Sequence, residues 1–206
     1  EGQYGYGDIF LGLAVPQSRQ LALKYKDLTF TEIKELLKSK IHEERLIGLL
    51  ILVNRFQKGD DETKKKSFDF YLKNTKYVNN WDLVDLSPDK IVGEFLQDKP
   101  TYILVDLAKS ESIWERRIAI ISTYAFIKRG KPNLTFKIAK ILINVKHDLI
   151  QKAVGWMLRE VGKRVSREKE EKFLKVHYKT MPRTTLRYAI EHSEPKVREK
   201  YLKGLI

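Results

Sequence analysis

Apolar side chains recur along the chain at the three- and four-residue spacing of amphipathic helices, and no stretch shows the strict alternation of a strand. Proline and glycine are sparse, with 6 and 11 among 206 residues, so the breaks between helical stretches are brief. The pattern predicts a succession of helices at 17–26, 30–39, 41–57, 61–77, 79–86, 88–97, 100–109, 112–129, 133–145, 147–163, 167–178, 182–191 and 195–204.

Two of these predicted helices have recognisable start signals. Thr29 and Glu32 have the spacing of a capping box, in which each side chain satisfies a backbone N–H of the other residue. Ser87 stands before Pro88, which predicts a serine cap followed by a proline in the first turn. Both signals support the helical interpretation of the apolar pattern.

Short helices joined by short breaks favour antiparallel pairs stacked side by side, and roughly six pairs of the HEAT-repeat size fit into 206 residues. We therefore predict an all-α fold, a HEAT-like superhelix forming a single curved domain over 1–206. No repeat consensus recurs cleanly, so a compact helical domain without repeats is the alternative. The chain does not begin with methionine, which leaves open a further helix before residue 1.

The positive charge of the chain is concentrated in its C-terminal half. The formal net charge is +13, and residues 111–206 carry 23 Lys and Arg against 10 Asp and Glu, while the rest of the chain is balanced. One-sided basic charge is typical of a surface that binds a polyanion. Nucleic acid is the favoured partner, with an anionic membrane or an acidic protein as alternatives, and a merely solvated basic surface as the simplest interpretation.

Several classes of chemistry are excluded by residue type. The chain has no cysteine, and its four histidines are far apart in the sequence, so no metal ion or other cofactor is predicted. No apolar run approaches the roughly 18 residues of a membrane span. The N-terminus lacks the basic start and apolar block of a signal peptide. We expect a cytoplasmic protein, associated with the nucleoid when bound to DNA, and without membrane contact.

Two helices carry a residue that simple packing does not explain. Arg117 follows Ile113 and precedes Ile121 on a mostly apolar helix row, so its guanidinium needs either an internal carboxylate or an external anion. Trp156 lies off the apolar stripe of its helix. Its neighbours there include basic residues, an arrangement used to contact nucleic acid; those residues are Lys152, Arg159 and Lys163. Packing of Trp156 against the next repeat is the alternative.

A third helix brings an aromatic ring and a carboxylate together. Trp81 and Asp85 are four residues apart and share one helix face, while Asp82 is interpreted as first-turn charge that complements the helix dipole. Farther along, Arg183 and Arg187 are also four residues apart, and they are candidate phosphate ligands or parts of a solvated face.

Four separated blocks, in order, resemble the bacterial DNA alkylation repair family, the AlkD-type alkylpurine DNA glycosylases built from HEAT-like repeats. They are GDIFLGLAVP at 7–16, NWDLVD at 80–85, IWERRIAI at 113–120 and KAVGWMLRE at 152–160. In that family the site consists of a tryptophan and an aspartate on one helix, an arginine and a second tryptophan. These fall on Trp81, Asp85, Arg117 and Trp156, the same four residues that the helical geometry had singled out.

The resemblance implies a glycosylase that hydrolyses the N-glycosidic bond of positively charged alkylpurines, 3-methyladenine and 7-methylguanine, in duplex DNA. Asp85 would be catalytic, and the two tryptophans, Arg117 and the basic residues would bind DNA, without a metal or other cofactor and with the protein a monomer. A non-catalytic protein that recognises damaged or branched DNA is the alternative, since some relatives bind without excision. The family's N-terminal aromatic residue is not assigned to Tyr4 or Tyr6, because a glycine-rich insert occupies that region.

Overall fold

The computed structural model describes residues 7–206 and confirms the all-α prediction. Within this part of the chain there is no β-strand, only an isolated parallel bridge between Ile9 and Ile41. The coordinates divide into two compact units, with the boundary between Asp98 and Lys99. The single curved domain over 1–206 stays a prediction.

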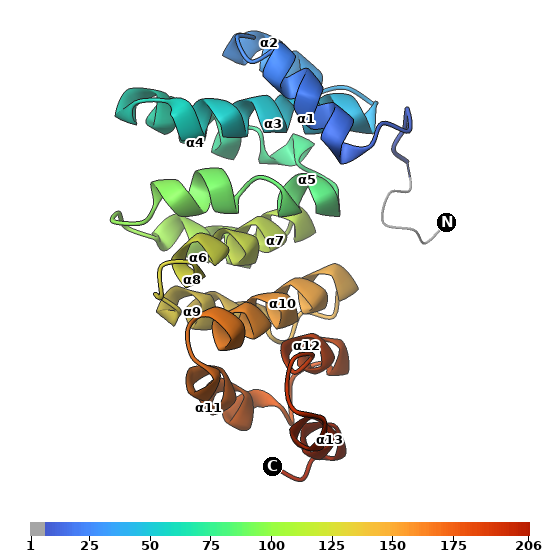
Figure 1. Cartoon of the computed structure of the whole chain (residues 1–206), viewed down its shortest axis with the longest axis vertical. Coiled ribbons are helices and arrows are strands. Elements are labelled where there is room, and N and C mark those ends of the chain that lie inside the picture. The colour runs from blue at the N-terminus through green and yellow to red at the C-terminus, as the bar shows by residue number, and fades with distance from the viewer. Residues whose placement is uncertain (1–6) are drawn as a thin grey trace. The chain divides into compact units, whose positions relative to one another are not determined.

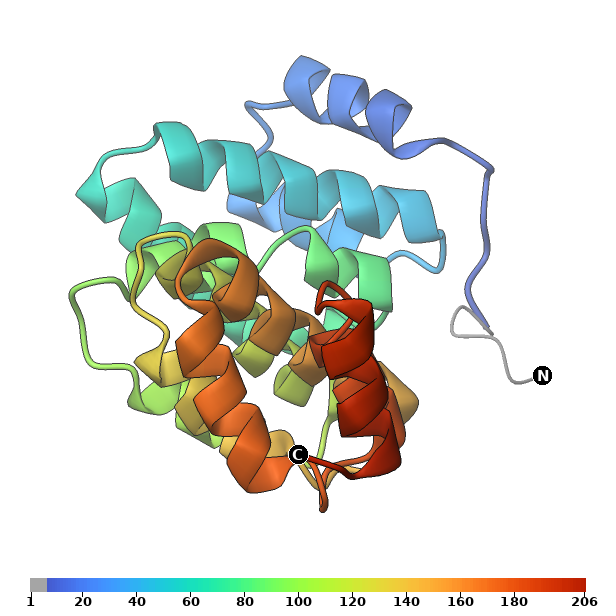
Figure 2. The same ribbon diagram turned by 60° about the horizontal axis from the view of Figure 1, so that its bottom comes forward.

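The N-terminal unit is built around one long helix (Figure 1). Helices α1 and α2 both pack against α3, α1 running alongside it in Figure 2, and α4 and the short α5 also contact it. The elements are α1 (Val15–Lys24), α2 (Phe30–Leu37), α3 (His42–Lys58), α4 (Asp61–Lys73), the 3₁₀ turn η1 (Thr75–Tyr77), α5 (Trp81–Asp85) and the π-helical turn η2 (Asp89–Gly93).

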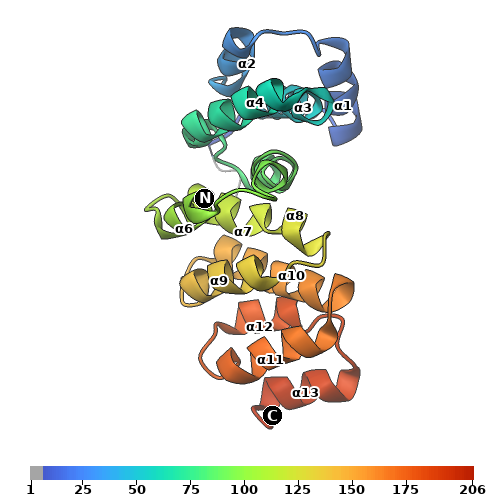
Figure 3. The same ribbon diagram turned by 90° about the vertical axis from the view of Figure 1, so that its left-hand side faces the viewer.

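The C-terminal unit stacks its helices in layers (Figure 3), in which α6 packs against α7 and α9 packs against α10, and α11, α12 and α13 follow. Helix α10 is central to the unit and packs against α7, α9, α11 and α12. The elements are α6 (Tyr102–Lys109), α7 (Ile113–Ser122), α8 (Tyr124–Ile127), α9 (Asn133–Leu142), α10 (Asp148–Arg164), α11 (Arg167–His177), α12 (Arg183–Ala189) and α13 (Pro195–Lys203).

The helix starts show one prediction confirmed and one that is wrong. The capping box is present, since the Thr29 hydroxyl accepts the Glu32 N–H and the Glu32 carboxylate accepts the Thr29 N–H. Ser87 caps no helix. Its buried hydroxyl donates to the Leu83 carbonyl and is hydrogen-bonded to the Tyr71 hydroxyl. Ser87 therefore packs against α4, which carries Tyr71, and does not lie at a solvated helix end.

Three predicted helices are broken at points that apolar spacing does not reveal. The predicted helix 112–129 divides at Thr123, whose hydroxyl bonds the Ile120 carbonyl. Predicted helix 61–77 ends at Lys73 and continues as a 3₁₀ turn. Predicted helix 88–97 begins as a π-helical turn, in which the Gly93 N–H bonds the Pro88 carbonyl. Each break changes the backbone hydrogen bonds at a point that the apolar spacing does not mark.

A buried glutamate makes the stability of the C-terminal unit depend on pH. Glu170 on α11 is fully buried, and burial raises the pKa of its carboxyl to about 7, although Arg167 lies 2.8 Å away. The carboxyl therefore binds its proton more tightly in the folded chain than in the unfolded chain. Its contribution to stability is complete below the ordinary pKa of 4.5 and is lost as the pH rises through about 7.

Glu170→Gln is expected to remove that pH dependence, because the amide keeps the shape of the side chain and never ionises. Between pH 4.5 and 7 the wild-type chain should lose up to about 3 kcal/mol of unfolding free energy relative to the variant, at about 1.4 kcal/mol per pKa unit. Urea unfolding at pH 5 and pH 8 measures the difference, with Glu168→Gln at an exposed position of the same helix as the control. Equal pH slopes for all three proteins would contradict the assignment.

Candidate functional site

Helix α5 in the N-terminal unit presents an aromatic ring and a carboxylate one turn apart, at Trp81 and Asp85. The side-chain oxygen of Asn80 accepts the Trp81 N–H at 2.7 Å and so caps the helix. Leu83 and Val84 are fully buried and anchor the opposite face of the helix. Trp81 remains 45% exposed and Asp85 partly exposed, so the predicted pair lies on an open surface rather than in the core.

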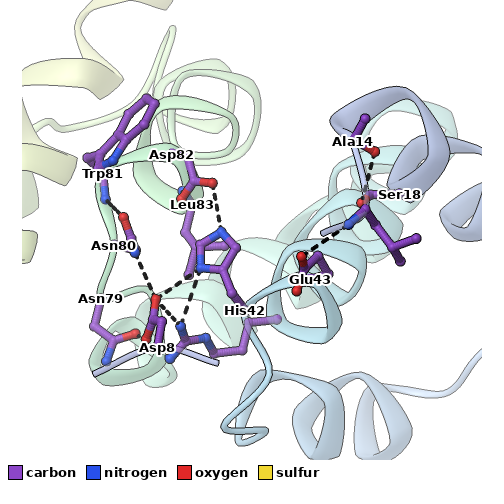
Figure 4. Close-up of polar contacts among 12 residues, drawn as sticks. Asp8, Ala14, Ser18, His42, Glu43, Asn79, Asn80, Trp81, Asp82 and Leu83 are labelled. Atoms are coloured by element: carbon purple, nitrogen blue, oxygen red, sulfur yellow. Dashed lines mark hydrogen bonds and ion pairs between the residues drawn. The ribbon is translucent and has the colours of Figure 1, made fainter. Parts of the chain in front are cut away.

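A buried polar network beneath α5 was not anticipated from the sequence (Figure 4). His42, at the start of α3, is 3% exposed and lies between two carboxylates. Its Nδ1 is 3.0 Å from an oxygen of Asp8, and its Nε2 is 2.7 Å from an oxygen of Asp82. Arg45 and Asn80 also bond Asp8, with Arg45 Nη2 at 2.6 Å and Asn80 Nδ2 at 2.7 Å. Asp82, interpreted above as a dipole partner only, is thus also a partner of His42.

The electrostatics of this network favour one set of protonation states. Burial opposes charge on Asp8, but hydrogen bonds from Arg45, Asn80 and His42 outweigh it and lower the pKa of the Asp8 carboxyl. Burial likewise opposes protonation of His42, but the carboxylates of Asp82 and Asp8 outweigh it and raise the pKa of the imidazole. The two carboxylates therefore favour the imidazolium form of His42.

The segment that carries Asp8 is held in place by a second carboxylate. Glu43 accepts the backbone N–H groups of Leu11, Gly12 and Leu13 at 2.9, 2.8 and 3.3 Å. Burial opposes charge on Glu43, but these backbone hydrogen bonds lower the pKa of its carboxyl. Glu43 therefore fixes the backbone that leads from Asp8 to α1. The adjacent His42 and Glu43 at the start of α3 were the sequence signal for this network.

Arg117 lies on α7 of the C-terminal unit and is buried, with 5% of its surface exposed. Its guanidinium donates to the backbone carbonyl of Leu149, in the first turn of α10. The sequence had predicted a carboxylate or an external anion as the partner of this charge. In the structure, a backbone carbonyl is also a partner of Arg117, and this hydrogen bond links α7 to the start of α10.

Trp156 lies on α10 and is half-buried. The residue before it, Gly155, marks the closest approach of α10 to α12. A Cβ atom at Gly155 would lie 2.5 Å from the Thr185 carbonyl oxygen and 2.5 Å from the Tyr188 Cβ. The glycine of the KAVGW block therefore sets how closely α12 packs beside Trp156.

Besides Arg117, the C-terminal unit holds five basic candidates, which fall into two groups. Lys152 pairs with Asp148 at 2.8 Å. Arg159 pairs with Glu191 beyond α12 and leaves only 17% of its side chain exposed, so it ties helices together. The other three are exposed on α10 and α12, where a phosphate can approach them; they are Lys163, Arg183 and Arg187.

The structure thus places Trp81 and Asp85 in the N-terminal unit and the other seven candidates in the C-terminal unit. That Trp81, Asp85, Arg117 and Trp156 act in one site stays a prediction. Tyr4 and Tyr6 lie outside the described residues. Across residues 7–206, no group of three or more His, Cys, Asp or Glu side chains could hold a metal ion, and no helix is long and apolar enough to span a membrane.

Comparison with known proteins gives one family and one fold. A family model described as DNA alkylation repair enzyme matches residues 3–193. A solved structure, a predicted DNA alkylation repair enzyme from Enterococcus faecalis, superposes with a TM-score of 0.68 at 17% sequence identity, covering 93% of this chain and 92% of that one. No match was found among curated proteins. At this identity the structural likeness establishes the fold alone.

Proposed function

Because the chain belongs to the DNA alkylation repair enzyme family, we propose that it is a DNA glycosylase that hydrolyses the N-glycosidic bond of positively charged alkylpurines in duplex DNA. One observation carries this proposal within the family assignment. Trp81 and Asp85 are presented together on the open face of α5, whose other face is anchored by buried residues. An exposed ring and a partly exposed carboxylate one turn apart can contact a cationic nucleotide and its sugar.

The chemistry suits a carboxylate without a metal ion. A purine alkylated at N3 or N7 carries a positive charge, so breaking the C1′–N bond sends the electron pair to the base, which leaves neutral. Positive oxocarbenium character develops on the sugar, and an ionised carboxylate near C1′ stabilises it. Water then bonds to C1′ and gives up a proton, for which Asp85 is the proposed acceptor.

The remaining candidates bind rather than react. The faces of Trp81 and Trp156 would attract the cationic nucleotide, by about 0.5–2 kcal/mol each. Arg117 would contact a phosphate through the 5% of its surface that is exposed. Its hydrogen bond to the Leu149 carbonyl fixes the direction of the guanidinium. The exposed Lys163 would contact the DNA backbone, together with the two exposed arginines of α12.

The second candidate function is DNA binding without excision. It is favoured by the exposed basic residues of α10 and α12, which need no catalytic carboxylate to hold a phosphate backbone. Incubation with methylated duplex DNA and measurement of released 3-methyladenine and 7-methylguanine distinguishes the two functions. Release supports the glycosylase. Tight, salt-sensitive binding without release would replace it with the second function.

The exposed basic residues should supply much of the DNA affinity. Replacing Lys163, Arg183 and Arg187 together with glutamine is expected to weaken binding about ten-fold to a hundred-fold and to reduce the slope of log affinity against log salt by about 2–3, since each lost phosphate contact removes about one unit. Fluorescence anisotropy with unmodified duplex DNA at several salt concentrations measures both quantities.

The control for this experiment carries the same change of charge. Helix α11 lies on the opposite side of the C-terminal unit from α12 in Figure 1, and Lys169, Lys172 and Lys175 are exposed on it. Their triple glutamine variant should keep most of the affinity. An equal loss from both triple variants would mean that net charge, rather than this surface, determines binding.

A further inference from the structure

The short helix α5 requires support from outside itself. It contains five residues, and helices of this length are not stable alone. Two backbone hydrogen bonds of 3.1 Å close its turn. The Val84 N–H donates to the Asn80 carbonyl, and the Leu86 N–H donates to the Asp82 carbonyl. The orientation of Trp81 and Asp85 therefore depends on what holds Asn80 and Asp82.

Both of these residues are held by the network around His42 (Figure 4). One oxygen of Asp82 accepts the backbone N–H of Leu83, and the other lies 2.7 Å from His42 Nε2. Asn80 caps α5 with its oxygen and donates from its nitrogen to Asp8, the residue bonded to the other nitrogen of His42. In Figure 4 the Trp81 ring points away from this cluster. His42 thus holds the first turn of α5 in two ways, directly through Asp82 and through Asp8 and Asn80.

We propose that His42 in its imidazolium form is a positioning residue for excision: by donating from Nε2 to Asp82 and from Nδ1 to Asp8, it fixes α5 and thereby the direction of Trp81 and Asp85. This inference rests on the proposed glycosylase function. His42 contacts no substrate in it and acts only through Asp82 and Asp8. It adds to the site a residue of α3, distant in sequence from α5.

Only the imidazolium can make both hydrogen bonds, because neutral imidazole carries a single N–H. The charged groups that face His42 are Asp8 from the N-terminal segment, Asp82 from α5, and Arg45 from its own helix at 3.5 Å. The two carboxylates favour the cation, and Arg45 is itself paired with Asp8. The double attachment is therefore complete at low pH and is lost as the pH rises through the raised pKa of His42.

Two amide variants separate the two bonds of His42. The amide nitrogen of glutamine reaches the place of Nε2 and keeps a donor toward Asp82, whereas that of asparagine reaches the place of Nδ1 and faces Asp8. His42→Gln should therefore keep most of the excision rate and lose the decline with rising pH. His42→Asn should lose about ten-fold or more in single-turnover rate at saturating DNA, as expected when a charge-assisted hydrogen bond is removed. DNA affinity should change little in either variant.

The experiment has two readouts and one control. Single-turnover excision is measured from pH 5.5 to 9, and hydrogen exchange of the peptide spanning α5 is followed in the same proteins. The α5 amides should exchange about ten-fold faster in His42→Asn than in His42→Gln, in line with the loss of that bond. His192→Gln, at an exposed histidine of the C-terminal unit, should match the wild-type chain in both measurements.

The outcomes distinguish this inference from the proposed function. A difference between the glutamine and asparagine variants in exchange and in rate supports the positioning role. Equal rates and equal exchange in the two variants, or a wild-type pH profile retained in His42→Gln, would overturn it. Absence of excision by the wild-type chain overturns the glycosylase function, while a faster α5 exchange in His42→Asn still supports the attachment of α5 by His42.

Discussion

Replacing Asp85 with asparagine is expected to lower the rate of alkylpurine excision by about a hundred-fold to a thousand-fold, the range found when a preorganised electrostatic partner of a transition state is removed. The amide has nearly the same shape as the carboxylate but carries no charge to stabilise the developing cation on the sugar. It is also a poor acceptor for the proton of the attacking water. DNA affinity should stay within about two-fold, because phosphate contacts supply most of the binding.

Excision by Asp85→Asn is measured on methylated duplex DNA under single-turnover conditions, alongside anisotropy with the same duplex. The control is Asp61→Asn, which removes a carboxylate from an exposed position on α4 of the same unit and should leave both quantities unchanged. Normal excision by Asp85→Asn would show that the carboxylate assignment is wrong. An equal loss of excision and affinity would indicate that Asp85 acts in binding instead.

Gly155→Ala is expected to destabilise the C-terminal unit by about 1–3 kcal/mol, although alanine is the better helix former by about 1 kcal/mol. The new methyl group would lie 2.5 Å from the Thr185 carbonyl oxygen, and that backbone atom cannot move without moving α12. Since α12 carries Arg183 and Arg187, its displacement should also weaken DNA binding.

Urea unfolding and DNA anisotropy test the effect of Gly155→Ala. Gly48→Ala on α3 is the matched control, because its Cβ would meet the Leu36 Cβ at 3.2 Å, a contact that needs α2 to move by only a few tenths of an ångström. We expect that control to be close to neutral in stability. A Gly155→Ala chain as stable as the wild type would mean that α10 and α12 separate freely, and the close approach would then have no role in placing α12.

The candidate site shows where sequence reasoning succeeds and where it fails. Trp81 and Asp85 were identified because residues four apart share one helix face, and Trp156 was identified because it lies off the apolar stripe of its helix. The structure leaves each of them at least partly exposed. The residues around them were harder to predict, since Arg159 and Lys163 are equivalent as charges in a sequence. Only the fold brings Glu191 against Arg159 and leaves Lys163 in solvent.

The His42 network could not be derived from the sequence, because its members are far apart along the chain. His42 is 34 residues from Asp8 and 40 from Asp82. No periodicity relates such positions, and their contact depends on how the N-terminal segment, α3 and α5 pack. The breaks at Thr123 and Pro88 were missed for a related reason, since they are changes in backbone hydrogen bonding that the spacing of apolar residues does not mark.

By itself, the sequence determined the helical class, most helix positions, the basic C-terminal half and the aromatic and acidic residues of α5, because these follow from local periodicity, composition and spacing. The tertiary structure alone decided which charges are paired, which remain exposed, and that His42 lies between the carboxylates of Asp8 and Asp82. The physical reason is that pairing and burial depend on distances in space, and the packing of helices brings together residues that the sequence keeps tens of positions apart.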